Sequence, residues 1–99
     1  MLYVSLAQEE LGNRMLKWIN ESKENPGYSV YYAIPERDEN VLYVIRQKRK
    51  TLDFTPKFWR AFVRTSKDAT LRVVYAAETR NECKAYIQDM ENTLNATNG

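Results

Sequence analysis

The side chains with the clearest chemical potential in this sequence are cationic, and they gather between residues 46 and 72. This stretch carries nine Lys or Arg and two acids, although the whole chain of 99 residues has a formal net charge of only +2. A concentrated positive surface attracts phosphates or an acidic protein surface. The sequence therefore predicts a binding site made of Tyr31 and these nine cations: Arg46, Lys48, Arg49, Lys50, Lys57, Arg60, Arg64, Lys67 and Arg72.

Four of the cations recur at a helical spacing. Thr55 and Pro56 match an N-cap followed by a first-turn proline, which predicts a helix over 56–67. Phe58, Trp59, Phe62 and Val63 would line one side of that helix. The opposite side would carry a basic stripe made of Lys57, Arg60, Arg64 and Lys67. Most of these bases have no acid four residues on, so ion pairing within the helix does not explain them. The alternative is a solvated face that only keeps the protein soluble.

Tyr31 is singled out by the alternation of side chains along the predicted strands. One set is strongly apolar and is expected to face the helices: Val30, Tyr32, Ile34, Val41, Tyr43, Ile45, Leu71, Val73 and Tyr75. The other set includes Tyr31, Arg46 and Arg72, which would then share a sheet face where a base could stack and its phosphate be held. A protein partner would use the same residue types. The alternative is that the C-terminal helix covers this face.

The residues that are missing exclude most familiar catalytic chemistry. The chain has no histidine and one cysteine, which removes histidine-based triads, histidine-ligated zinc and cysteine-rich metal sites. No glycine-rich phosphate loop is present. Glu36, Asp38 and Glu39 lack the spacing of a calcium loop and are interpreted as a solvated turn, and Cys83 as an inert buried thiol. We therefore expect no enzyme, no metal and no cofactor.

The elements that must position these residues are those of a small α+β domain. Hydrophobic periodicity and turn residues predict a short strand at 2–4, a helix over 6–23, a hairpin of strands 28–34 and 41–47, the helix 56–67, a strand over 70–76, and a last helix opened by the capping box Thr79–Glu82. This order, (β)αββαβα, is ferredoxin-like with an extra C-terminal helix. The alternative is a less regular three-stranded α+β sandwich. Residues 1–99 form one domain, with 95–99 expected to fray.

Two resemblances bear on this fold. The ferredoxin-like order is similar to that of RNA-recognition domains, but the aromatic-rich motif of those domains is missing from the strands YSVYYAI, VLYVIRQ and TLRVVYA. The ending ETRNECKAYIQDME resembles the closing helix of the arm-type DNA-binding domains of integrases. A capping box and an amphipathic helix carry that second likeness, and no family is assigned on it.

Two functions fit this composition. The first is a small inhibitor or adaptor that docks its basic, aromatic surface onto a nucleic-acid-handling enzyme or nucleoprotein, similar in style to anti-restriction and anti-CRISPR proteins of phages and mobile elements. The second is a module that binds RNA or DNA directly with the same residues. No window of about 18 uncharged apolar residues occurs, so no membrane span is expected. We do not expect the start MLYVSLAQEE to act as a signal peptide, and the single cysteine predicts a cytoplasmic location.

Overall fold

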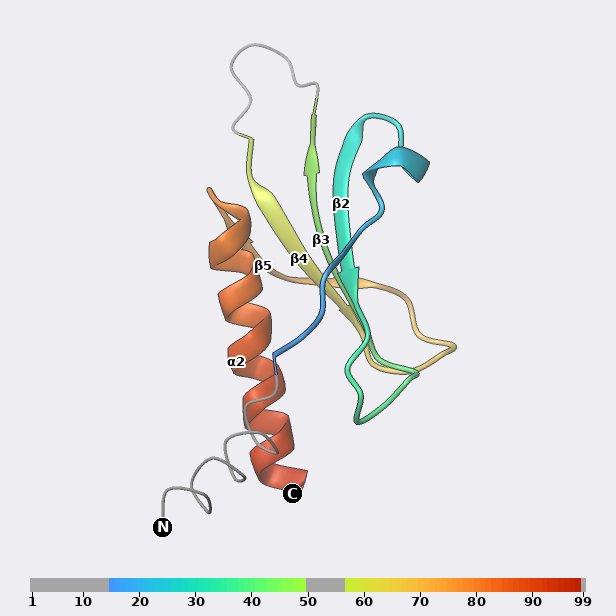
Figure 1. The fold of residues 1–99 in the computed structure, drawn as a ribbon, viewed down its shortest axis with the longest axis vertical. Helices are drawn as coiled ribbons and strands as arrows, with labels where there is room; N and C mark the ends of the chain where they lie inside the picture. The colour runs from blue at the N-terminus through green and yellow to red at the C-terminus, as the bar shows by residue number, and fades with distance from the viewer. Residues whose placement is uncertain (1–14, 50–56, 99) are drawn as a thin grey trace.

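The computed structural model describes residues 15–49 and 57–98 of the chain, with side chains through residue 94. These residues form one antiparallel sheet of five strands, a short 3-10 helix and one α-helix (Figure 1). The α+β class is therefore as predicted. The elements in chain order are β1 (Ile19–Asn20), η1 (Ser22–Glu24), β2 (Tyr28–Ala33), β3 (Leu42–Lys48), β4 (Trp59–Arg64), β5 (Arg72–Ala77) and α2 (Arg80–Asn98).

The sheet is a meander in which each strand pairs with the next one along the chain, in the order β1-β2-β3-β4-β5. Tyr31 lies opposite Ile45, and Ile45 lies opposite Ala61. Because side chains alternate between the two faces of a strand, odd-numbered residues of β2, β3 and β4 share one face and even-numbered residues share the other. In β5, Tyr75 lies opposite Ala61, but a bulge between Ala61 and Phe62 shifts the register, so that Val73 lies opposite Phe62 and Arg72 opposite Val63.

The helix α2 covers the odd-numbered face, which we call the helix-covered face. It contacts β3, β4 and β5, and Figure 1 shows it running beside this part of the sheet. The small side chains of Ala61 and Ala77 allow the helix to approach the strands closely. The buried core lies between the two layers and contains Val41, Tyr43, Ile45, Ala61, Val63, Ala77, Cys83 and Ile87.

The even-numbered face, which we call the helix-free face, is not covered by α2, and of the described helices only the short η1 also contacts β2. Its members come from all four long strands: Tyr28, Val30, Tyr32, Leu42, Val44, Arg46, Lys48, Arg60, Phe62, Arg64 and Val73. On this second face Val30 and Val44 are buried, whereas Arg46, Lys48, Arg60 and Val73 are exposed.

The predicted helix over 56–67 is wrong, because residues 59–64 form strand β4. Its apolar residues fit two periods at once, but Trp59, Ala61 and Val63 alternate toward the core while Arg60 lies on the other face. Aromatic and β-branched residues favour strands, and pairing with β3 on one side and β5 on the other fixes that choice. With one α-helix in the described residues, the ferredoxin-like order is not found.

The predicted helix over 6–23 is also wrong in the part that the structure describes, which is residues 15–23. Residues 6–14 of the prediction lie outside the described part. Ile19 and Asn20 pair with β2 as strand β1, and only the 3-10 turn η1 follows. Leu16 and Trp18 are half-buried while their neighbours Met15 and Lys17 are exposed, which is the alternation of an extended chain. The Glu21 amide donates to the Val30 carbonyl over 2.8 Å, which continues the attachment to β2.

The hairpin is confirmed, but the predicted phase of its first strand is wrong. Val30 lies opposite Arg46, so Val30 and Tyr32 point away from the face that holds Tyr43 and Ile45. A shift of one residue in register exchanges the two faces of a strand, and the loop from residue 34 to residue 41 sets that register. Tyr31 therefore belongs to the helix-covered face and Arg46 to the helix-free face.

The last strand and the last helix are confirmed as elements, but the predicted phase of the strand is wrong for Val73, which lies on the helix-free face opposite Phe62 because of the bulge. At the predicted capping box, the Glu82 amide donates to Thr79 Oγ1 over 3.2 Å, and the Thr79 hydroxyl donates to Glu82 Oε1 over 3.1 Å. The helix continues to Asn98, through most of the segment predicted as a tail.

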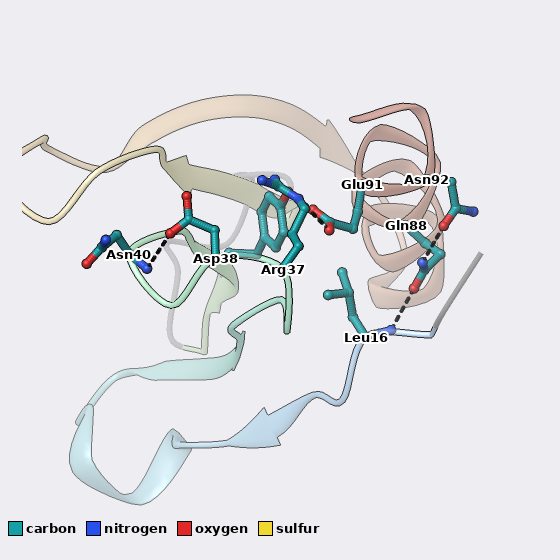
Figure 2. A network of polar contacts seen from close by, with 8 residues as sticks. Leu16, Arg37, Asp38, Asn40, Gln88, Glu91 and Asn92 are labelled. Carbon is teal, nitrogen blue, oxygen red and sulfur yellow. Dashed lines mark hydrogen bonds and ion pairs between the residues drawn. The ribbon is translucent and has the colours of Figure 1, made fainter. Parts of the chain in front are cut away.

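A buried polar network fastens the hairpin loop to α2 (Figure 2). Glu91 on α2 is only 2% exposed. The Tyr43 hydroxyl donates to Glu91 Oε1 over 2.6 Å, and Arg37 Nε donates to Glu91 Oε2 over 2.7 Å. One turn of helix earlier, Gln88 Oε1 accepts from the Leu16 amide over 2.8 Å. Burying a carboxylate is costly unless it is paired, and here each oxygen has a donor.

Candidate functional site

The four long strands carry positive charge and no negative charge. The sequences of β2 to β5 contain five Lys or Arg and no Asp or Glu. All acids of the described residues lie in the loops, in η1 or on α2. Four of the five cations lie on the helix-free face: Arg46, Lys48, Arg60 and Arg64. This face is therefore a field of one sign, which is the arrangement that binds an anionic partner.

Arg46 lies at the centre of this face and is held between two aromatic rings. Its guanidinium carbon lies 4.5 Å from the centre of the Phe62 ring on β4 and 5.2 Å from that of Tyr28 on β2. These distances are those of cation–π contacts. The three side chains form a row across β2, β3 and β4, so an arginine plane and two rings are presented together on one surface.

Arg60 places a second charge directly beside this row. Arg46 and Arg60 are cross-strand partners in the register of β3 with β4. Side chains directly opposite each other in antiparallel strands lie about 5 Å apart at Cβ, and like charges in such a pair are destabilising. Both side chains are exposed. An anion bound between them would remove this repulsion.

Arg64 extends the charge toward the end of β4. It lies opposite Leu42 on the same face, is half-buried, and its buried Nε has no hydrogen-bond partner within the described residues. Tyr32 and Phe62 are also half-buried. The helix-free face thus combines partly accessible rings with cations that form no ion pair within the described residues.

The other predicted basic residues are dispersed. Arg49 has a structural role, because its Nη2 donates to the Asn25 carbonyl over 3.1 Å and its amide to the Gly27 carbonyl over 2.7 Å. Lys57 and Lys67 are exposed and lie outside the strands. Arg72 lies opposite Val63 and therefore belongs to the helix-covered face. Lys50 lies outside the described residues.

The predicted platform of Tyr31 with Arg46 and Arg72 is not formed, because Tyr31 and Arg46 lie on opposite faces. The Tyr31 hydroxyl instead accepts a hydrogen bond from Arg80 Nη1 over 2.5 Å. The Arg80 guanidinium lies 4.6 Å from the Tyr31 ring centre, and Lys84 Nζ lies 5.3 Å from it. Trp59 completes this group, with its ring centre 6.2 Å from that of Tyr31.

Sequence reasoning missed Arg80 and Lys84. They lie in the C-terminal part of the sequence, which has more acids than bases, so a search for basic segments does not select them. Their spacing of four residues on a helix was the available signal, since it places both on one side. Their contact with β2 depends on the tertiary packing.

Burial and local contacts shift the pKa of four described groups, Arg37, Tyr43, Cys83 and Lys84. Burial raises the pKa of the Cys83 thiol, which is in contact with the Trp59 carbonyl oxygen at 3.4 Å. Burial, and next the neighbouring Arg80 charge, lower the pKa of Lys84. Within residues 15–49 and 57–98, no group of three or more Cys, Asp or Glu is placed to hold a metal ion. No described helix is long and apolar enough to cross a membrane.

Comparison with known proteins adds no relative to this picture. No protein-family model, no curated protein and no solved structure matches the chain.

Proposed function

We propose that the protein binds a nucleic acid strand on its helix-free face. The observation that carries the proposal is the charge of the sheet: five cations and no acid in strands β2 to β5, with four of those cations on one face. Phosphate contacts made by Lys and Arg supply much of the affinity for nucleic acids, and a cationic surface without neighbouring acids favours them.

The rings on the same face favour a single strand over a duplex. Tyr28, Tyr32 and Phe62 are half-buried on the helix-free face, and Arg46 lies between two of them. Aromatic side chains and arginine planes stack on unpaired bases, which are hidden inside a duplex. In this proposal Arg46, Arg60, Arg64 and Lys48 contact phosphates, and the rings contact bases.

The test is binding of the purified protein to labelled single-stranded RNA, single-stranded DNA and duplex DNA at low and near-physiological salt. We expect the single strands to bind more tightly, with an affinity that falls steeply as salt rises. The double charge reversal R60E/R64E is expected to abolish binding. A neutral R60Q/R64Q protein should keep weaker binding, and its log–log salt slope should be shallower by about 0.7 for each single-strand phosphate that it no longer neutralises.

The matched control reverses two charges elsewhere. Lys17 and Lys23 are exposed and lie outside the sheet faces, so K17E/K23E changes the net charge as much as R60E/R64E does. If both double variants lose the same affinity, the interaction is a general charge effect and the proposed face is wrong. If none of the three nucleic acids binds, direct recognition is wrong as a whole.

A protein partner is the second candidate, and it is favoured by apolar residues at the edges of the same face. Val73 on β5 is 53% exposed, and Ile19, which pairs with Tyr32, is 50% exposed. Exposed apolar side chains beside arginine and aromatic rings are typical of protein interfaces. Under this function, the protein is an inhibitor or adaptor of a nucleic-acid-handling enzyme. Substituting Val73 by the neutral Ser should then weaken partner binding, whereas phosphate-driven binding should change little.

A further inference from the structure

A second cationic group lies on the other side of the sheet, where β2, β4 and the first turns of α2 meet. Arg80 and Lys84 come from α2, Tyr31 from β2 and Trp59 from β4. The guanidinium carbon of Arg80 lies 4.6 Å from the Tyr31 ring centre and 6.0 Å from that of Trp59, and Lys84 Nζ lies 5.3 Å from the Tyr31 ring. All four side chains are half-buried, so the group is partly accessible to solvent.

The two cations are held together against their mutual repulsion. Like charges four residues apart destabilise a helix, and positive charge near a helix N-terminus opposes the helix dipole. Neither side chain forms an ion pair within the described residues. Glu82 lies between them in sequence, but its carboxylate accepts from the Thr79 hydroxyl over 3.1 Å. The lowered pKa of Lys84 reflects this partly desolvated, uncompensated environment.

The donors left over are suited to an oxyanion. Arg80 Nη1 donates to the Tyr31 hydroxyl, and Arg80 Nε is buried without a partner in the described part of the chain, so the remaining N–H groups of the two Nη atoms are the Arg80 donors left for a ligand. The Lys84 ammonium contacts a ring face and forms no hydrogen bond with the described residues. A group with two negative charges and several acceptor oxygens would satisfy both.

We propose that Arg80 and Lys84, positioned by Tyr31 and Trp59, bind a phosphate dianion, either free or as the terminal phosphate of a nucleotide. Arginine supplies directional donors for such a group and lysine supplies a mobile point charge. The site uses none of the residues of the helix-free face. A test of this phosphate site is therefore independent of the test of nucleic acid binding on the helix-free face.

The experiment follows Trp59 and Arg80 during titration with inorganic phosphate, AMP and adenosine, each at ionic strength held constant with sodium chloride. The chain has two tryptophans, so W18F leaves Trp59 as the only tryptophan reporter. The Arg80 Nε–H signal is followed by NMR in the same titrations. We expect a saturable change with phosphate and with AMP and none with adenosine. Saturation by phosphate and not by AMP would assign the site to the free anion.

K84Q is the main variant, because Lys84 has no hydrogen bond to the described residues that the substitution would remove. It should weaken phosphate binding about tenfold or more, as expected when a charge-assisted hydrogen bond to the ligand is removed. R80Q should do the same, with circular dichroism showing that the fold is kept. The control K17Q/K23Q removes two exposed charges elsewhere and should leave the affinity within about twofold. A linear response, or K84Q binding phosphate as tightly as this control, would overturn the proposal.

Discussion

Two charged regions of this protein are built in opposite ways. Around Glu91, a buried carboxylate has a donor for each oxygen, and Arg37 and Tyr43 have it as their common partner. On the helix-free face, Arg46, Arg60 and Arg64 lie in strands that contain no acid at all. The first region is electrostatically complete, whereas the second is not.

This difference separates structural charge from charge available to a ligand. A buried ionic group must be paired by the protein itself, because water cannot compensate it. Exposed cations such as Arg46 and Arg60 are compensated by water and can exchange that water for phosphate. We therefore expect substitutions around Glu91 to change stability, and substitutions on the helix-free face to change binding.

The largest expected effect is that of E91A. Removing the carboxylate leaves the buried Tyr43 hydroxyl without its acceptor and Arg37 without its ion pair. We expect the free energy of unfolding to fall by about 3 kcal/mol, the lower end of the range for breaking a buried pair, because Arg37 is 23% exposed and can turn to solvent. Urea denaturation at pH 7 measures this change.

Two matched variants sharpen the result. D89A removes an exposed carboxylate two residues earlier on α2 and should change stability by no more than about 0.5 kcal/mol. E91Q keeps an acceptor for Tyr43 while losing the charge, so its stability should lie between those of E91A and the unmodified protein. If E91A and D89A are equally stable, the Glu91 network does not stabilise the fold. The proposed difference between this network and the helix-free face is then wrong.

The next effect is a pH dependence centred on Tyr43. Burial, and next the hydrogen bond to Glu91, raise the pKa of Tyr43 to about 12 from an unfolded value of 10. The folded state therefore binds this proton more tightly than the unfolded state does. Its contribution to stability is fully present below pH 10 and is lost as the pH rises from 10 to about 12.

Stability measured against pH tests this assignment. Y43F cannot ionise at this position, so its unfolding midpoint should fall less between pH 10 and 12 than that of the unmodified protein. Absorbance of the tyrosinate should show one of the seven tyrosines titrating late, and that late component should be absent in Y43F. Equal slopes for the two proteins would show that the Tyr43 proton is not held by the network.

The hairpin, the last strand and the last helix could be predicted from sequence because local signals specify them. PERDEN is a turn between two β-rich runs, and Thr79 with Glu82 forms the predicted capping box. These signals act over a few residues and do not depend on distant neighbours. The register of the hairpin is different, since one residue of slip exchanges the faces, and sequence alone did not fix it.

The element around Trp59 could not be identified because its pattern fits two periods. Trp59, Phe62 and Val63 have helical spacing, whereas Trp59, Ala61 and Val63 have strand spacing. Pairing with β3 and β5 decides between them, and pairing partners distant in sequence are invisible to a local pattern. The Glu91 network likewise joins residues 37, 43 and 91 and has no local signature.

The candidate site was nevertheless predicted in part, for a geometric reason. Arg60 and Arg64 are four residues apart, a spacing that shares a side both on a helix and on a strand. They therefore remain together on the helix-free face although the predicted element was wrong. Lys57 and Lys67, whose positions suited only the helix, fall outside the strand.

The smallest expected effect on stability is that of R60Q/R64Q, and it completes the comparison. Arg60 opposes Arg46 in a like-charge pair, and Arg64 holds a buried Nε without a partner in the described residues. Neutralising both removes repulsion and leaves the Arg37–Glu91 ion pair intact, so the free energy of unfolding should stay within about 0.5 kcal/mol of the original or rise slightly. The same variant should bind single-stranded nucleic acid more weakly. A stability loss as large as that of E91A would mean that these arginines hold the sheet together, and their lack of acidic partners would then say nothing about a ligand.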